Sequence, residues 1–301
     1  MTITSPVVRA RHLGMQFGDV AALTDADFTL HRNTIYGLLG RNGAGKTTLM
    51  QLLAGHLRPT TGSVEVFGAD PYENTAVLQQ LCFVADTQRH PDDLRVGHVL
   101  ASAELLLPLW DRGYAERLAE RFALPCGRKV KKLSRGMSSA LGIVVGLASR
   151  APVTIFDEPY LGLDAVARQM FYDELLLDYA ERPRTVVLST HLIDEAADLL
   201  EHVLVLDRGH LVVDEDTDTL RTRAAQATGP ADEVARIVGD STVLHTEGLG
   251  GVARTTFLRS DPDELPRTSG PVDVQPISLQ DLVVHLHRTS ASATTNEEAS
   301  L

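Results

Sequence analysis

Eight consecutive residues have the types and spacing of a phosphate-binding loop. Glycine allows unusual backbone dihedrals and lets amide N–H groups approach a ligand closely, so that they point at phosphate oxygens. A lysine at the end of such a loop reaches the β- and γ-phosphates, and the neighbouring hydroxyl joins a Mg²⁺ shell. The pattern therefore predicts binding of a nucleoside triphosphate with Mg²⁺. The eight residues are Gly40, Arg41, Asn42, Gly43, Ala44, Gly45, Lys46 and Thr47.

Two adjacent carboxylates, Asp157 and Glu158, follow the apolar run at residues 153–156. Asp157, at the end of a buried strand, is suited to hold Mg²⁺ through its hydration shell. Glu158 is placed to orient or deprotonate an attacking water. Taken alone, two acids can also simply mark the exit from a strand. With a phosphate loop upstream in the chain, we favour a hydrolytic role.

The phosphate loop requires a buried strand before it and a helix after it. Residues 35–39 form an uninterrupted apolar run, which is typical of a buried strand. A helix is expected from Lys46 to about Ala54, because Gly55 and Pro59 follow it. The loop would then lie at a helix N-terminus, where the backbone amides and the helix dipole favour phosphate.

Further along the chain, short apolar runs alternate with helical patterns, which predicts a parallel sheet wrapped by helices and hence an α/β fold. Asp207, Arg208 and Gly209 have the composition of a tight hairpin turn. Strands are expected at residues 7–12, 26–30, 63–67, 81–85, 153–156, 185–189, 203–206 and 211–213, and helices at 96–124, 134–149, 166–179 and 193–201.

The character of the sequence changes after about residue 220. We expect a linker at 220–229 and a small C-terminal domain at 230–287. This domain contains strand-like runs between Gly- and Pro-rich turns, and a helical pattern at 278–287. The tail at 288–301 is small and polar, and we expect it to be disordered.

The whole chain of 301 residues carries a net charge of −12. This acidic balance argues against non-specific nucleic-acid binding, so no nucleic-acid partner is expected. The most apolar windows, at 99–110 and 140–148, are too short to span a bilayer, which requires about 20 apolar residues. Cys82 and Cys126 show no metal-binding or redox spacing. We expect a cytoplasmic chain that depends on another polypeptide for any membrane span.

Five ordered motifs resemble those of ABC-type ATPases. Residues 133–137, Leu-Ser-Arg-Gly-Met, are similar to the signature sequence of that family. Residues 157–159 and 162–164 resemble its acidic strand end and the loop that follows. Residues 189–191, Ser-Thr-His, resemble its switch histidine, and residues 17–18 lie where the family places an aromatic ring against adenine.

The resemblance covers roughly residues 5–220 and implies a P-loop NTPase of the ABC ATPase type. Its core would be a mixed sheet with an antiparallel β layer and a helical subdomain at about 88–150, followed by a small C-terminal α/β appendage. Such domains form head-to-tail dimers that hold ATP between two subunits. The residues implied in ATP binding are Phe17, Gly40, Arg41, Asn42, Gly43, Ala44, Gly45, Lys46, Thr47, Thr48, Ser134 and Gly136.

The resemblance also implies individual roles. Lys46, Glu158 and His191 would be catalytic, with His191 joining the γ-phosphate, the attacking water and the loop at Asp164. The Ser134 hydroxyl and the helix N-terminus near Gly136 would contact ATP held by the partner subunit. The Mg²⁺ ligands would be Thr47, Asp157 and Asp86.

Three positions depart from the family pattern. Arg135 replaces the first signature glycine, and Met137 replaces the usual glutamine. The family also places a glutamine just after the strand expected at 81–85, where this chain has Asp86. We favour Asp86 in that role, and the alternative is a shifted loop in which Gln88 serves.

Residues 275–282 resemble the ending of ATP-binding subunits of ABC-2-type exporters, although this appendage could also be an unrelated packing unit. The favoured hypothesis is an ATPase that powers an exporter from the cytoplasmic face of a separate membrane permease. The permease would dock near residues 86–106, and the ATPase would work as a homodimer or a heterodimer. The alternatives are a soluble regulatory ABC ATPase, similar to a translation factor, and an importer subunit.

Overall fold

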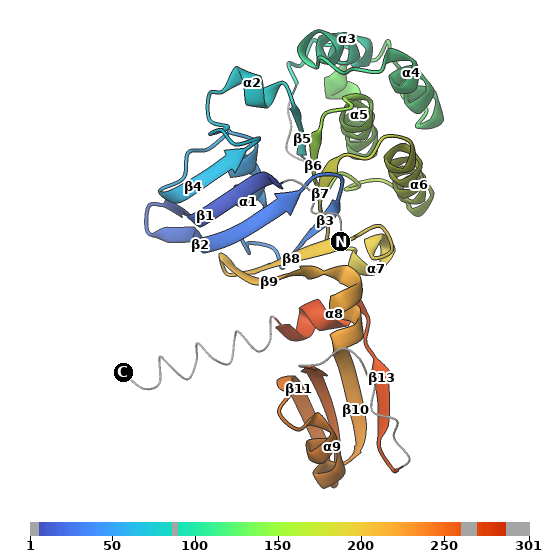
Figure 1. Ribbon diagram of the computed structural model, residues 1–301. Coiled ribbons are helices and arrows are strands. Elements are labelled where there is room, and N and C mark those ends of the chain that lie inside the picture. Colours follow the sequence, from blue (N-terminus) through green and yellow to red (C-terminus); the bar gives the residue numbers. More distant parts are fainter. Residues whose placement is uncertain (1–5, 86–89, 260–269, 287–301) are drawn as a thin grey trace.

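A six-stranded sheet forms the centre of the molecule (Figure 1). The computed structural model describes residues 6–85, 90–259 and 270–286. The strands run parallel except for β9, which pairs antiparallel with β8. Every residue of β3, β6 and β7 is buried, as their apolar sequences predict. In spatial order the strands are β5 (Leu81–Ala85), β6 (Val153–Asp157), β7 (Thr185–Ser189), β3 (Ile35–Leu39), β8 (His202–Asp207) and β9 (His210–Asp216).

A three-stranded antiparallel sheet forms a second layer, with β1 (Pro6–Phe17) between β2 (Val20–His31) and β4 (Thr61–Val66). Its buried face shares one apolar core with β3 and with helix α1 (Lys46–Leu53). The expected strands at 7–12 and 26–30 are confirmed and prove longer than expected. This packing places the start of α1 next to β2.

Helix α2 joins the core shared with α1, whereas α3 to α7 pack on the other side of the six-stranded sheet; Figure 1 shows α3, α4 and α5 gathered at one end of the molecule. The single helix expected at 96–124 is wrong, because Pro108 interrupts it and Asp111 caps a second helix by accepting the Tyr114 N–H. The helix expected at 193–201 ends at Ala196. The helices are α2 (Thr75–Leu78), α3 (Val96–Leu106), α4 (Arg112–Arg121), the 3-10 turn η1 (Val130–Lys132), α5 (Arg135–Ala148), α6 (Ala165–Glu181) and α7 (Ile193–Ala196).

The C-terminal part contains a four-stranded antiparallel sheet in the order β11-β12-β10-β13. The linker expected at 220–229 is wrong, because this stretch forms the end of a helix and then an inner strand that pairs on both sides. Small Ala residues of that strand pack beneath helix α9. The elements are α8 (Thr217–Arg223), β10 (Ala224–Pro230), α9 (Ala231–Val238), β11 (Thr242–Leu249), β12 (Val252–Leu258) and β13 (Asp273–Pro276).

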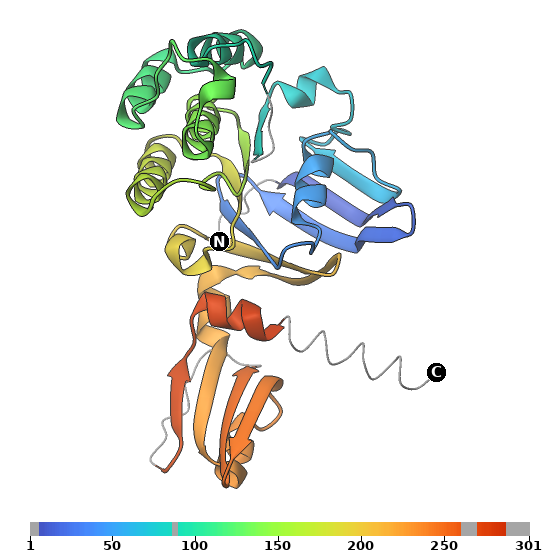
Figure 2. The ribbon, with the colours of Figure 1, turned by 180° about the vertical axis from the view of Figure 1, so that it is seen from behind.

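Residues 279–286 form a last helix that returns toward the six-stranded sheet, and Figure 2 shows it, in red, beside β9. Leu279, Leu282 and Val283 are buried and join the core beneath the sheet. The C-terminal sheet is therefore tied to the rest of the chain by packing as well as by α8. Among the residues the structure describes, no helix combines the length and apolar character needed to cross a bilayer.

Candidate active site

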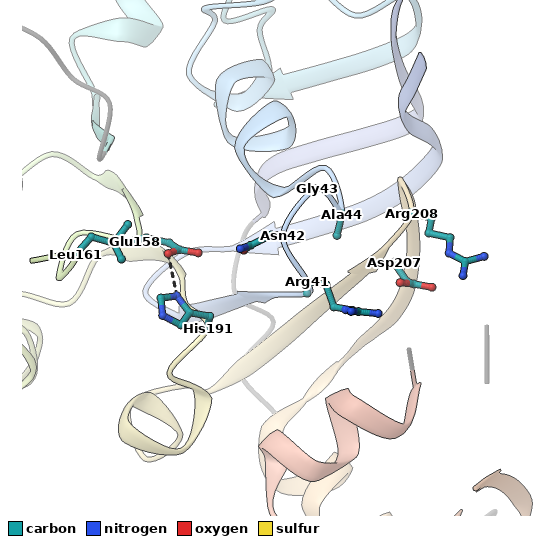
Figure 3. Close-up of a pocket in the computed structure, with 10 residues that line it drawn as sticks. Arg41, Asn42, Gly43, Ala44, Glu158, Leu161, His191, Asp207 and Arg208 are labelled. Carbon is teal, nitrogen blue, oxygen red and sulfur yellow. Dashed lines mark hydrogen bonds and ion pairs between the residues drawn. The ribbon is translucent and has the colours of Figure 1, made fainter. Parts of the chain in front are cut away.

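The predicted phosphate loop lies at the carboxyl end of β3 and leads directly into α1 (Figure 3). Gly40, Gly43 and Gly45 have φ angles of +146°, +81° and +105°, which residues other than glycine rarely adopt. A Cβ atom on Gly45 would also lie 2.4 Å from the carbonyl oxygen of Ala22 on β2. Glycine is thus required at this position by both the dihedral angle and the close packing of the antiparallel layer.

Lys46 lies within the loop and is only 6% exposed. Its Nζ donates hydrogen bonds to the carbonyl oxygens of Gly40 (2.7 Å) and Arg41 (3.0 Å). Burial lowers the pKa of this ammonium group, while the carboxylates of Glu158 and Asp157 oppose that shift. Phosphate oxygens would offer stronger, charged acceptors at the same point.

Asp157 and Thr47 meet at the base of the pocket, where Thr47 Oγ1 donates to Asp157 Oδ2 at 2.8 Å. Burial raises the pKa of Asp157, and the neighbouring charge of Glu158 raises it further. A hydroxyl and a buried carboxylate supply the oxygen ligands that Mg²⁺ prefers, and a cation here would relieve the cost of the buried charge. The residues therefore fit a Mg²⁺ site.

Glu158 and His191 lie together at one side of the pocket, and Figure 3 shows the hydrogen bond between Glu158 Oε2 and His191 Nδ1, which are 2.8 Å apart. Glu158 adopts a left-handed φ of +47°, which turns its side chain away from the strand β6 that precedes it. The two residues come from the ends of neighbouring strands, β6 and β7, so the sheet itself sets their separation.

Tyr160 fixes the position of His191, a role that the sequence did not reveal. The Tyr160 hydroxyl accepts the His191 backbone N–H (3.0 Å) and donates to Thr190 Oγ1 (2.7 Å). Burial raises the pKa of this tyrosine to about 12, so it remains a neutral donor. A tyrosine three residues after Asp157 resembles any other core residue in the sequence.

A pocket of about 710 Å³ opens over the phosphate loop, and a second of about 410 Å³ lies on its α1 side. The β8–β9 hairpin forms one wall of the first pocket, because the Gly209 N–H donates to the Ala44 carbonyl at 3.0 Å. The structure confirms the hairpin turn predicted at residues 207–209 and places it beside the phosphate loop. The first pocket is lined by Gly40, Arg41, Asn42, Gly43, Ala44, Glu158, Leu161, His191, Asp207 and Arg208, and the second by Val20, Ala21, Ala22, Asn42, Gly43, Gly45, Lys46, Thr47, Thr48, Asp157, Glu158 and Leu161.

Three of the expected ATP-binding residues lie apart from these pockets. Ser134 and Gly136 begin helix α5, and neither lines either pocket. Phe17, 47% exposed at the turn between β1 and β2, also lines neither, although Val20 from the same turn lines the second. Asp86 lies outside the described residues, as does the alternative at position 88.

The start of α5 packs directly on the loop that follows Glu158. A Cβ atom on Gly136 would lie 2.4 Å from the Gly162 carbonyl oxygen, and Ser139 Oγ donates to the Leu161 carbonyl at 2.5 Å. Ser134 caps α5 by accepting the Met137 N–H at 3.2 Å. The signature residues are therefore linked by contact to the loop that lines the phosphate pocket.

Comparison with known proteins agrees with this geometry. The ABC transporter family profile matches residues 23–161, and a profile described as an AAA domain, putative AbiEii toxin, type IV TA system, matches residues 128–195. An uncharacterized ABC transporter ATP-binding protein of Methanocaldococcus jannaschii is 30% identical over 209 residues, covering 69% of this chain and 76% of that protein. The doxorubicin resistance ATP-binding protein DrrA of Mycobacterium tuberculosis is 32% identical over 215 residues, covering 69% of this chain and 64% of DrrA.

Solved structures show the same fold. The structure of an ATP-binding subunit of an ABC transporter superposes with a TM-score of 0.65 at 24% identity, covering 71% of this chain and 92% of that one. A dimeric ATP-binding cassette bound to ADP and phosphate superposes with a TM-score of 0.62 at 20% identity, covering 70% of this chain and 98% of that one. The sequence relatives and the shared fold together establish that this chain belongs to the ABC transporter family, as one of its ATP-binding, ATP-hydrolysing subunits.

Proposed function

We propose that this chain hydrolyses ATP to power an exporter, with Glu158 as the general base and His191 as its partner. The observation that carries the proposal is the 2.8 Å contact between these two side chains at the edge of the phosphate pocket. Glu158 accepts a proton from the attacking water, and His191 orients the γ-phosphate and the water. Lys46 stabilises the charge that develops on the transferred phosphoryl group.

The Mg²⁺ ion would be held by Thr47 and Asp157. When bound, the ion neutralises charge on the β- and γ-phosphates. The support for this assignment is the 2.8 Å contact between the Thr47 hydroxyl and the buried Asp157 carboxylate. A bound cation would also offset the repulsion between the charges of Asp157 and Glu158.

We further propose that two chains assemble head to tail, so that Ser134 and Gly136 of one chain complete the site of the other. The separation of these residues from the pockets of their own chain supports this arrangement. The N-terminus of α5 carries no acidic residue in its first turn, and its backbone amides attract a phosphate. The dimer closes with ATP bound and loosens after hydrolysis, because only the γ-phosphate contacts both chains.

The membrane permease would be a separate chain, docked at the cytoplasmic face on the segment around α3 and the turn that follows it. Leu105, Leu106 and Leu109 are exposed there, and Leu105 is 87% exposed. Apolar side chains clustered in this way indicate an interaction surface. A relative named for doxorubicin resistance supports an exporter, and the permease would select the transported molecule.

Replacement of Glu158 by Gln tests the hydrolytic role. We expect phosphate release to fall by about 10²–10⁴-fold, which is the usual contribution of a general base. The affinity for Mg²⁺-ATP should stay close to that of the parent, because glutamine keeps the size of the side chain and one of its two acceptor oxygens. Glu120→Gln on the exposed face of α4 is a matched control. Full turnover in Glu158→Gln would remove Glu158 from the mechanism.

Replacement of Leu105 and Leu106 by Ser tests the docking surface. The permease is expressed with the ATPase, and the two are purified together from membranes by a tag on the permease. We expect the double variant not to be recovered with the permease, while its ATPase activity in solution is retained. Leu176→Ser and Leu177→Ser on α6, which are also exposed, serve as the control. Equal recovery of both variants would place the permease elsewhere.

A further inference from the structure

A third pocket on the ATPase, of about 210 Å³, is walled by arginines. It lies at the amino ends of the sheet strands, where residue 33 precedes β3, residue 152 precedes β6 and residue 184 precedes β7. The ATP pocket lies at the carboxyl ends of these strands, roughly 15 Å away along strands of five residues. Its lining residues are Val7, Arg32, Asn33, Arg150, Pro152, Arg182, Pro183, Arg184 and Thr185, and none of them is acidic.

Two of the guanidinium groups, those of Arg150 and Arg184, are buried in the wall with 7% and 5% of their side chains exposed. Both pair with the same carboxylate, Asp178, which lies behind them. The Nε–H groups of both arginines have no hydrogen-bond partner among the described residues. A buried donor without an acceptor is costly, so the contacts within the wall leave these two arginines incompletely satisfied.

The local charges do not balance. Asp178 and Asp111 are the carboxylates in ion pairs with these arginines, and Asp111 pairs with Arg150 at 3.3 Å and Arg182 at 3.8 Å. Four guanidiniums thus face two carboxylates in a chain that is acidic as a whole. Burial lowers the pKa of Arg184 to about 10, and the nearby Arg182 charge acts in the same direction.

We propose that this pocket binds a phosphate group. The surplus of two guanidiniums matches the charge of a phosphate dianion, and the planar fork of arginine fits phosphate oxygens in pairs. Arg32 and Arg182 are exposed at the mouth and can close over the ligand, while Asn33 offers a neutral donor. The pocket has room for several waters, at about 30 Å³ each. It is smaller than pockets that hold whole cofactors, and this size favours a small anion over a nucleotide.

The proposal is tested with inorganic phosphate on the full chain, saturated beforehand with Mg²⁺ and a non-hydrolysable ATP analogue so that the phosphate loop is filled. Calorimetric titration at constant ionic strength in chloride buffer should show one phosphate site per chain. The double variant Arg32→Gln/Arg182→Gln should bind phosphate at least roughly tenfold more weakly, because two charge-assisted contacts are lost. Both side chains are exposed, so no buried charge is left behind.

The matched control is Arg58→Gln/Arg254→Gln, since both arginines are exposed and Arg58 lies over an aromatic ring, as Arg32 does. This control should bind phosphate like the parent. Thermal unfolding in chloride buffer without phosphate reports whether each variant folds. If the double variant does not fold, the single variant Arg182→Gln takes its place. Equal loss of phosphate binding in the variant and the control would overturn the proposal.

A second arm distinguishes the source of the phosphate group. The parent and the double variant are sedimented with vesicles of phosphatidylglycerol and, separately, of phosphatidylcholine. In one outcome the parent binds phosphatidylglycerol but neither phosphatidylcholine nor free phosphate, and the double variant loses that binding. This outcome would support a phosphate-binding pocket and assign the phosphate group to a lipid headgroup. Binding of free phosphate with equal sedimentation of both proteins would assign it to the soluble ion. If neither probe distinguishes the variant from the parent, the site is refuted.

Discussion

At the scale of single residues, Asp157 illustrates the conflict between stability and function. Its carboxylate is 8% exposed, and burial followed by the charge of Glu158 raises its pKa. Because the pKa is higher in the folded chain than in the unfolded chain, ionising Asp157 lowers stability. The cost appears as the pH rises above the ordinary value of 3.8 and is complete above the raised pKa. Bound Mg²⁺ would offset it.

Asp157→Asn should therefore stabilise the chain in the absence of nucleotide while abolishing ATP turnover. The gain in melting temperature should be present at pH 7 and should shrink as the pH falls toward 3.8. In the folded chain the parent Asp157 then becomes protonated, and it is neutral like the asparagine of the variant. Thermal unfolding between pH 4 and pH 8, without Mg²⁺ or ATP, measures it. A variant that melts below the parent at pH 7 would show that the Asp157 charge is already compensated within the protein.

The Tyr160 hydroxyl offers a second residue-scale prediction, because it holds the backbone of His191. Tyr160→Phe leaves that N–H without its acceptor and should lower the free energy of unfolding by about 1–2 kcal/mol. ATP turnover should fall by about tenfold, since small displacements of catalytic groups are costly. Tyr72→Phe, outside the pockets, is the control for both measurements. Unchanged turnover in Tyr160→Phe would show that His191 is positioned by its side-chain contacts alone.

The sequence predicted the residues of this site better than their supporting contacts. The spacing of the glycines and Lys46 is a local pattern, so it can be recognised in the sequence wherever such a loop occurs. Tyr160 and the hairpin at Arg208 are constrained only by packing between distant segments, and residue types alone do not encode such packing. A single sequence therefore identifies the groups that line the pocket but misses the contacts that hold them in place.

At the scale of elements, the contact between α5 and the loop after β6 links the signature residues to the ATP pocket. Gly136→Ala would place a Cβ atom 2.4 Å from the Gly162 carbonyl oxygen, so α5 and the loop must move apart. We expect a stability loss of about 1–3 kcal/mol, typical of overpacking, and a larger loss of ATP turnover than of ATP binding. Denaturant unfolding, nucleotide titration and phosphate release measure the three effects.

Gly127→Ala is the matched control for this change. Gly127 belongs to the same part of the chain, but a Cβ atom there would meet no atom within 4 Å. Its stability and turnover should therefore match those of the parent. If the two variants behave alike, the glycine requirement at the start of α5 does not arise from its contact with the loop.

The element scale also shows why a linker was predicted at 220–229. Residues such as Ala225, Ala227 and Gly229 have low strand propensity and resemble a connecting segment. In the structure they form β10, which gains its stability from pairing with β12 and β13 and from packing under α9. Propensity measures only the local chain, so long-range pairing overrides it. The alternating strands and helices of the ATPase core were predictable because each carries its own apolar pattern.

At the scale of the whole molecule, the proposed dimer divides each ATP site between two chains. Lys46 is 6% exposed within the phosphate loop, whereas Ser134 is exposed at the start of a different helix. A chain with Lys46→Ala cannot hold ATP but presents an intact α5 N-terminus. A chain with Ser134→Glu holds ATP but presents a negative charge to the γ-phosphate bound by its partner, and that charge repels the phosphate.

Each variant alone should therefore be nearly inactive, and a mixture of the two should recover activity. In a mixed dimer, the phosphate loop of the Ser134→Glu chain faces the intact α5 of the Lys46→Ala chain, which completes one working site. With random pairing, half of the dimers are mixed and each has one site of two, so the mixture should reach about a quarter of the parent rate. Phosphate release at equal chain concentrations measures this recovery, and the double variant Lys46→Ala/Ser134→Glu, added to either single variant, is the control that cannot complement. A mixture no more active than its components would mean that each chain builds its ATP site without a second copy, and the head-to-tail dimer would have to be abandoned.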